Sequence, residues 1–178
     1  RPINFPPGAP GQGSFVIETD KGKVAVVSAM GRTFMNPPIE NPFLALDQEV
    51  AALRQETPVI FLDFHAEATS EKIAMGRYLD GRVSAVVGTH THVQTADETI
   101  FPGGTAYLTD AGMCGPIESV IGSQIQPVLE RFTTCLPRRF TVASGPVLLC
   151  GAVIDIDAAS GKAKSIVRLQ ERWEPPAV

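Results

Sequence analysis

The sequence predicts a mixed α/β fold that forms one domain over residues 1–178. Two nearly continuous apolar runs, 59–65 and 83–87, lie on either side of a helical segment, which is typical of two parallel strands joined by a helix. Strand-like segments dominate the last third of the chain and add sheet content there. With 178 residues, 44% of them hydrophobic, the chain is long enough to bury a core and too apolar to be disordered.

The N-terminal region predicts a hairpin between two irregular segments. Residues 1–13 are rich in proline and glycine, which favours an irregular lead-in. Segments 14–19 and 23–29 are apolar and β-branched, and residues 20–22 between them contain a glycine, so we expect two antiparallel strands. The prolines and glycine of residues 31–42 predict a loop.

Two helices are expected in the middle of the chain. The first covers 42–56, because apolar residues recur there at helical spacing and Asn41 can cap its first turn. The second begins at Thr69 or Ser70, either of which can act as its N-cap, and ends at Gly81. Each helix precedes one of the two apolar runs.

The C-terminal half predicts mostly strands. Segments 98–101 and 105–109 flank a Pro-Gly-Gly turn and predict a second hairpin. Residues 110–123 contain three glycines and are expected to be a loop, and 124–135 is predicted as a helix. The remaining segments predict a β-meander over 139–144, 147–157 and 163–173.

Charge and composition exclude several classes of protein. The net charge is −4 and the chain has no block of lysine or arginine, so a stable nucleic-acid partner is not expected. A small nucleotide or phosphate ester is still compatible with this charge, since a bound metal can supply positive charge. No apolar run is as long as a membrane span, and the first residues do not resemble a signal peptide, so no membrane partner is expected.

The three cysteines predict a reducing compartment. Cys114, Cys135 and Cys150 are an odd number at wide spacing, which is typical of reduced thiols in a cytoplasmic protein. None belongs to a Cys-x-x-Cys pair, so we expect buried structural cysteines rather than reactive ones.

The placement of the histidines is the main indication of chemistry. His65 ends one predicted buried strand, and His90 and His92 follow the end of the next. Carboxyl ends of parallel strands meet at one edge of a sheet, where ligands bind. Imidazole is a common ligand of zinc, iron and manganese, so the sequence predicts a metal site formed by all three. The alternative is that each histidine is a partly buried residue without a metal.

Residues near the histidines extend this hypothesis. In an extended segment His90 and His92 would point the same way, because side chains two residues apart share a face. By the same rule Asp63 would share the face of His65, either close to the metal or as a supporting carboxylate. Thr89 and Thr91 are candidates for orienting ligands or phosphate, although ordinary strand-end threonines would fit equally. Further acidic residues lie nearby, namely Glu67, Glu71, Asp97 and Asp110; of these, Glu67 and Glu71 are expected in a solvated turn and a helix N-terminus.

At these residues the sequence resembles the YmdB-like metallophosphoesterases. The resemblance is carried by two ten-residue blocks, 63–72 (DFHAEATSEK) and 88–97 (GTHTHVQTAD), which contain all three histidines. Segments 105–113, 119–122 and 1–6 continue it, so that it covers essentially the whole chain.

The resemblance implies a calcineurin-like fold, in which a sandwich of two β-sheets is flanked by helices and carries two metals at one edge. It implies His65, His90 and His92 as ligands of two divalent ions (Mn, Fe or Zn), and a small phosphodiester or cyclic nucleotide as substrate. The other ligands of the family, and the histidine that protonates the leaving group, belong to an N-terminal segment whose motifs do not occur here. The chain therefore resembles the C-terminal two thirds of such an enzyme, with its N-terminal strands missing and its general acid elsewhere.

The sequence is compatible with two functions, that of an enzyme and that of a non-catalytic module. In the first, two metals would clamp a phosphodiester and a bridging hydroxide would attack phosphorus in line with the leaving oxygen. In the second, the chain is a truncated, non-catalytic module that binds metal or self-associates through an exposed sheet edge, giving a homo-oligomer. A zinc amidohydrolase also uses a His-x-His pair, but its long β/α barrel needs more than 178 residues.

Overall fold

The computed structural model describes residues 1–36 and 39–174, which form two sheets and three helices. Sheet A has the strand order β1-β2-β3-β4-β6-β5, formed by β1 (Ser14–Thr19), β2 (Gly22–Met30), β3 (Ile60–His65), β4 (Ala85–Thr89), β5 (Thr99–Ile100) and β6 (Ala106–Leu108). Sheet B has the order β7-β8-β9, formed by β7 (Cys114–Pro116), β8 (Val147–Ile156) and β9 (Ala163–Trp173). The helices are α1 (Pro42–Leu53), α2 (Thr69–Tyr78) and α3 (Ile125–Thr134).

The centre of sheet A is parallel. Strands β2, β3, β4 and β6 run in one direction, and the short β5 and the N-terminal β1 pair antiparallel at the two sides. The predicted strand–helix–strand unit is therefore confirmed as β3-α2-β4. Its register pairs His65 with Thr89, so both strands end at the same level of the sheet.

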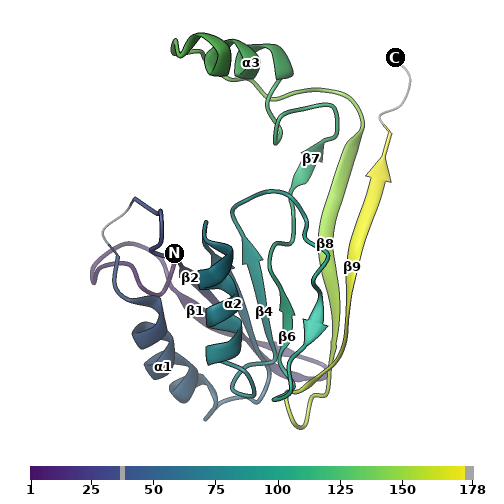
Figure 1. Cartoon of the computed structure of the whole chain (residues 1–178). Helices are drawn as coiled ribbons and strands as arrows, with labels where there is room; N and C mark the ends of the chain where they lie inside the picture. Colours follow the sequence, from purple (N-terminus) through teal and green to yellow (C-terminus); the bar gives the residue numbers. More distant parts are fainter. Residues whose placement is uncertain (37–38, 175–178) are drawn as a thin grey trace.

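The core lies between sheet A and the first two helices, which cover the same face (Figure 1). Alternate residues of β3 are fully buried against them because side chains of a strand alternate between its faces. These buried side chains are Ile60, Leu62 and Phe64, packed in one cluster with Leu46 and Val50 of α1, Met75 of α2 and Leu79 at the C-cap of α2. The other face of β3 presents Phe61, Asp63 and His65, which are only half-buried.

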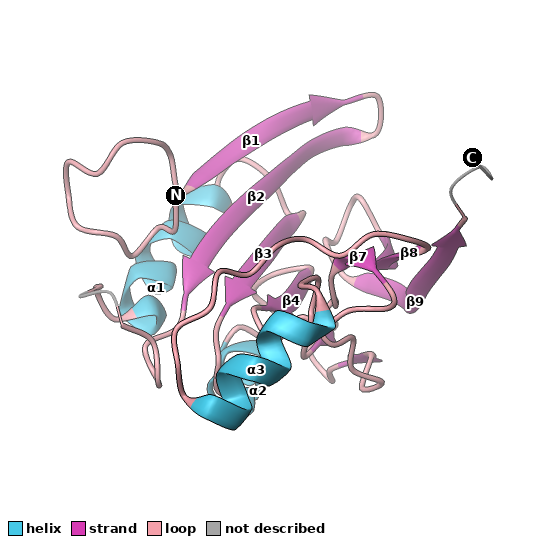
Figure 2. Ribbon diagram, turned by 90° about the horizontal axis from the view of Figure 1, so that it is seen from above, coloured by secondary structure: helices cyan, strands magenta, loops and turns pink. Residues whose placement is uncertain are grey.

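Sheet B lies on the face of sheet A opposite to the two helices. Ala152 and Ile154 of β8 line a gap together with Phe61 and Asp63 of β3. Strands β8 and β9 form a long antiparallel hairpin that extends beyond sheet A and turns at residues 157–162, as predicted (Figures 1 and 2). This arrangement of two sheets and helices agrees with the expected α/β fold.

The helices begin where the sequence predicts but end earlier. Asn41 caps α1 by accepting a hydrogen bond from the backbone N–H of Phe43 at 3.0 Å. The predicted cap of α2 is wrong, because Thr69 is already its first helical residue and the cap position is Ala68, which offers no side-chain bond. Both helices stop about three residues before the predicted ends, where turns replace helical hydrogen bonding.

Two strand predictions in the C-terminal half are wrong. The expected loop over 110–123 contains β7, which pairs with β8. The expected strand 139–144 is absent from the described residues, where Val142 makes only an isolated bridge with Ser123. At Val147, Leu148 and Leu149, strand β8 is paired on both sides, with β7 and β9, so a further strand cannot pair with this part of it.

The cysteines are not buried, contrary to expectation. Cys114 and Cys135 are exposed and Cys150 is half-buried, and all three are free thiols. Cys135 follows α3 in the left-handed conformation at its C-cap, on the surface of the molecule. Among the described residues no helix combines the length and the apolar character needed to cross a membrane.

Candidate active site at the carboxyl edge of sheet A

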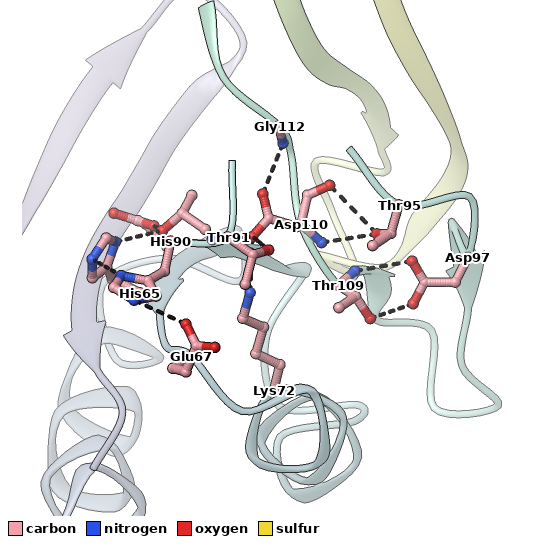
Figure 3. A network of polar contacts seen from close by, with 12 residues as sticks. His65, Glu67, Lys72, His90, Thr91, Thr95, Asp97, Thr109, Asp110 and Gly112 are labelled. Carbon is pink, nitrogen blue, oxygen red and sulfur yellow. Dashed lines mark hydrogen bonds and ion pairs between the residues drawn. The ribbon is translucent and has the colours of Figure 1, made fainter. Parts of the chain in front are cut away.

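Two of the three histidines meet at the carboxyl edge of sheet A. His65 is the last residue of β3, and His90 directly follows the last residue of β4. Their rings contact edge to face, with centroids 4.7 Å apart and planes at 87°. Nδ1 of His90 lies 2.9 Å from Nε2 of His65, and Figure 3 shows the two rings directed at each other.

Hydrogen bonds on the far side of His65 fix its orientation. Nδ1 of His65 lies 3.1 Å from Oγ1 of Thr89, and the Thr89 hydroxyl donates to Oδ1 of Asp63, also at 3.1 Å. Because the threonine proton is directed to the carboxylate, its oxygen accepts from Nδ1–H of His65. The lone pair of His65 is therefore on Nε2, the atom that faces His90.

Glu67 orients His90 in a corresponding way. Oε2 of Glu67 lies 3.1 Å from Nε2 of His90, at the far end of the ring from His65 (Figure 3). A carboxylate only accepts, so His90 donates from Nε2–H and its lone pair is on Nδ1. Glu67 is exposed and follows β3 by two residues, where the sequence predicted only a solvated turn.

The donor chemistry of this pair fits a shared cation. Two nitrogen lone pairs that face each other at 2.9 Å repel unless a proton or a metal ion lies between them. Carboxylate support behind a metal-binding imidazole is common, because it fixes the tautomer and the ring. The pair is only part of a centre, however: within residues 1–36 and 39–174 no three His, Cys, Asp or Glu side chains are grouped as a complete metal site.

The electrostatics keep His65 in the neutral form that binds metals. Burial lowers the pKa of His65, and the neighbouring His90 lowers it further. Burial raises the pKa of Asp63, although the hydrogen bond from Thr89 opposes this rise. A neutral imidazole at neutral pH offers its lone pair without first losing a proton.

Among the described residues, His92 shares no hydrogen bond with His65 or His90. The expected extended conformation of residues 90–92 is wrong, because His90 and His92 have φ angles of 106° and 68° and β4 already ends at Thr89. The rule that side chains two residues apart share a face therefore does not apply to His90 and His92. His92 is exposed and lines a cavity together with Gln94 and Met113.

A buried ion pair holds the loop between the two histidines. Oδ2 of Asp110 accepts from the backbone N–H of Thr91 at 3.0 Å and from its hydroxyl at 2.6 Å. The same oxygen lies 2.8 Å from Nζ of Lys72, and both charged side chains are almost completely buried (Figure 3). Thr91 is thus bonded inward, not presented to a substrate.

Asp97 and Thr95 extend this polar network to the end of β6. Asp97 accepts from the backbone N–H of Thr109 at 3.2 Å and from its hydroxyl. The hydroxyl of Thr95 accepts from the backbone N–H of Asp110 at 2.9 Å. Segment 90–97 is therefore bonded to residues 109–110 along its length, which fixes the loop that carries His90 and His92.

Neither Lys72 nor Glu67 was predicted from the sequence to have a role in the site. A signal for Lys72 was available, since it lies three residues before Met75 and seven before Leu79 on the apolar side of α2. A lysine at core spacing indicates a buried partner, which here is Asp110. Glu67 has no comparable signal, because its contact depends on the turn at His90.

Residues 1–169 match the family of YmdB-like proteins. The chain belongs to this family. It is 54% identical over 169 residues to a 2′,3′-cyclic-nucleotide 2′-phosphodiesterase of Bacillus subtilis, an alignment that covers 95% of this chain and 64% of that protein. The chain thus spans a little less than two thirds of the length of this relative.

Two solved structures have a similar fold. A hypothetical protein from Thermus thermophilus superimposes with a TM-score of 0.91 at 41% identity, over 98% of this chain and 67% of its own. A novel phosphatase from Mycoplasma pneumoniae gives a TM-score of 0.89 at 35% identity, over 99% and 64%. The fold described above is therefore the fold of these two proteins over about two thirds of their chains.

Proposed function

We propose that this chain carries the histidine half of a metal-dependent phosphodiesterase site that acts on cyclic nucleotides. The observation that carries the proposal is the convergence of the His65 and His90 lone pairs. Thr89, bonded to Asp63, holds the far side of the His65 ring, and Glu67 holds the far side of the His90 ring. The relationship to a 2′,3′-cyclic-nucleotide 2′-phosphodiesterase supports this reaction and this substrate class.

The metal would be held by His65, His90 and His92, as ligands of two divalent ions (Mn, Fe or Zn). When bound, two such ions supply charge neutralisation of the phosphate and activation of a water for in-line displacement. His92 belongs to this set because the family resemblance implies it as a ligand, and it lies in the same loop as His90. The general acid is not among the residues assigned here.

Other residues of the chain would orient the histidine ligands. Asp63, through Thr89, holds the ring of His65, and Glu67 holds the ring of His90. The Lys72–Asp110 pair fixes the backbone at Thr91, between His90 and His92. Because the hydroxyls of Thr89 and Thr91 are already engaged, neither threonine is assigned to phosphate binding.

The experiment is hydrolysis of a 2′,3′-cyclic nucleotide with added Mn²⁺. Residues 1–178 alone are expected to show little turnover, because three imidazoles do not supply the bridging carboxylate that holds two cations together. Turnover is expected when the part of the relatives that this chain does not match is supplied as a fusion. In that fusion His90→Ala should reduce turnover by at least about 100-fold, since even supporting residues of metal sites contribute ~10–100-fold.

Gln126→Ala, on the exposed surface of α3, serves as the control and should leave turnover unchanged. Circular dichroism of each variant confirms that the fold is retained. Near wild-type turnover of the His90→Ala fusion would contradict the proposal, and so would full turnover of residues 1–178 without the additional segment.

A second candidate is a non-catalytic module that binds metal or self-associates. It is favoured by one observation: β1 is a side strand of sheet A, and its Phe15 and Ile17 are about half exposed. An apolar side strand with free backbone groups invites pairing with another chain. This candidate predicts no hydrolysis by the fusion, so the same assay separates the two functions.

A further inference from the structure

A cavity of about 340 Å³ opens beside His92. Its lining comes from the loops that follow β4 and β6, from β7 and from sheet B. Its walls are mainly apolar and are formed by Met113, Pro116, Ile117 and Leu148. Ligand pockets have volumes of roughly 300–1,000 Å³ and mostly apolar linings, so this one can take a single planar ring system but not a peptide or polynucleotide.

The cavity lies next to the loop of the histidine site, because His92 lines it and follows His90 by two residues. Leu148 and Cys150 line it, and the next residues on the same face of β8 are Ala152 and Ile154. Ala152 and Ile154 face the gap that also contains Asp63 and Thr89, the residues that hold His65. The face of β8 that lines the cavity therefore continues to the residues that hold His65.

Two glutamine side chains give the cavity hydrogen-bonding capacity. Nε2 of Gln94 is within hydrogen-bond distance of the carbonyl oxygens of Ala111, Gly151 and Leu169, which fixes this side chain between the loop and sheet B. Its Oε1 is buried and has no hydrogen-bond partner among the described residues. An unpaired buried acceptor is unfavourable, so a ligand that donates a hydrogen bond to it would be stabilised. Gln170, on the exposed side of the lining, adds a second amide.

We propose that this cavity binds the nucleobase of the phosphodiester, while the phosphate lies at His65 and His90. A base has two apolar faces, which suit the walls, and an edge of N–H donors and acceptors, which suits an amide side chain. The inference rests on the proposed function for the position of the phosphate. It adds the part of the molecule that binds the base and selects for esters that carry one.

The test uses residues 1–178 without metal and adenosine as the probe, so that neither phosphate nor turnover is involved. Leu148→Trp fills the cavity, whereas Leu149→Trp is the matched control because Leu149 belongs to the opposite, exposed face of the same strand. Calorimetry should show saturable binding of adenosine and none of ribose. Leu148→Trp should weaken binding by about tenfold or more, and Leu149→Trp should change it by less than about twofold.

A second readout does not depend on the variants. Adenosine should slow alkylation of Cys150, which lines the cavity, and should leave alkylation of the exposed Cys135 on α3 unchanged. Absence of Cys150 protection, or undiminished binding by Leu148→Trp, would overturn the proposal. Hydrolysis by the fusion without adenosine binding would reject the base pocket alone, and adenosine binding without hydrolysis would reject the phosphodiesterase alone.

Discussion

Lys72 and Asp110 connect the core of the molecule to the candidate site. Lys72 belongs to α2, Asp110 follows β6, and their contact at 2.8 Å is shielded from water. Burial raises the pKa of Asp110, but its hydrogen bonds with Lys72 and Thr91 lower the pKa more, so that the net change is downward. The carboxylate is thus ionised at neutral pH and can accept all of its hydrogen bonds, including that from the backbone of Thr91.

Lys72→Met is predicted to lower the free energy of unfolding by about 3–5 kcal/mol, because it leaves the buried charge of Asp110 without its partner. The measurement is urea denaturation followed by circular dichroism. Lys72→Met/Asp110→Asn should lose less than the sum of the two single variants, since it removes both charges. Lys21→Met, on an exposed turn, is the control and should unfold at the wild-type midpoint. A loss below about 1 kcal/mol in Lys72→Met would show that the pair has no structural role.

Gly88 shows why the elements of the site tolerate little change. It lies in β4, where its carbonyl oxygen accepts from the backbone N–H of Ala111 at 2.9 Å. A Cβ atom at this position would come within 1.8 Å of the carbonyl oxygen of Thr109. The close approach of β4 to residues 109–111 therefore requires glycine, and it brings Asp110 next to the loop that carries His90 and His92.

Gly88→Ala is predicted to destabilise the protein by about 1–3 kcal/mol or more, because backbone must shift to admit the methyl group. Gly151→Ala is the matched control, since Gly151 also lies in a strand but has no atom within 4 Å of an added Cβ. Thermal denaturation of the two variants provides the comparison. Equal melting temperatures for both would mean that β4 and residues 109–111 are not in close contact.

The elements that the sequence predicted best are those with a strong local pattern. The runs at β3 and β4 are almost entirely apolar because helices cover one of their faces and sheet B approaches the other, and this pattern is visible without a structure. Strand β7 has three residues, one of them glycine and one proline, and it exists only because β8 has a free edge there. Such pairing depends on tertiary context and leaves no periodic signal.

The candidate site shows the same difference between features set by local sequence and features set by tertiary contacts. The sequence placed His65 and His90 at one edge of the sheet, because that depends only on where two strands end. It did not predict the positive φ angles of His90 and His92, which reorient the loop and allow His90 to reach Glu67. Non-glycine residues adopt this conformation when surrounding contacts require it, as the bonds from Thr91 to Asp110 do here.

In the molecule as a whole, apolar side chains are exposed on the first strand of sheet A. Phe15 and Ile17 of β1 are about half exposed, and no strand pairs with the outer side of β1 within the described residues. Burial of this strand against a second chain would remove apolar area from water and satisfy its backbone groups. A homo-oligomer of residues 1–178 is therefore expected.

Ile17→Lys is predicted to shift residues 1–178 from an oligomer towards a monomer, because a charge on the side strand opposes pairing. Sedimentation velocity over a range of concentrations measures this. The control is Leu44→Lys, which places the same charge at an exposed apolar position of α1 and should leave the association unchanged. A wild-type chain that sediments as a monomer at all concentrations would exclude self-association through β1.

The claim that the three histidines form a metal site is tested most directly by Mn²⁺ titration of residues 1–178, observed through the imidazole signals in a two-dimensional NMR spectrum. The chain has only three histidines, so single His→Asn variants assign every signal. The account predicts that substoichiometric Mn²⁺ broadens the signals of His65, His90 and His92 together. Signals of His65 and His90 that stay sharp while Mn²⁺ is bound elsewhere would contradict it.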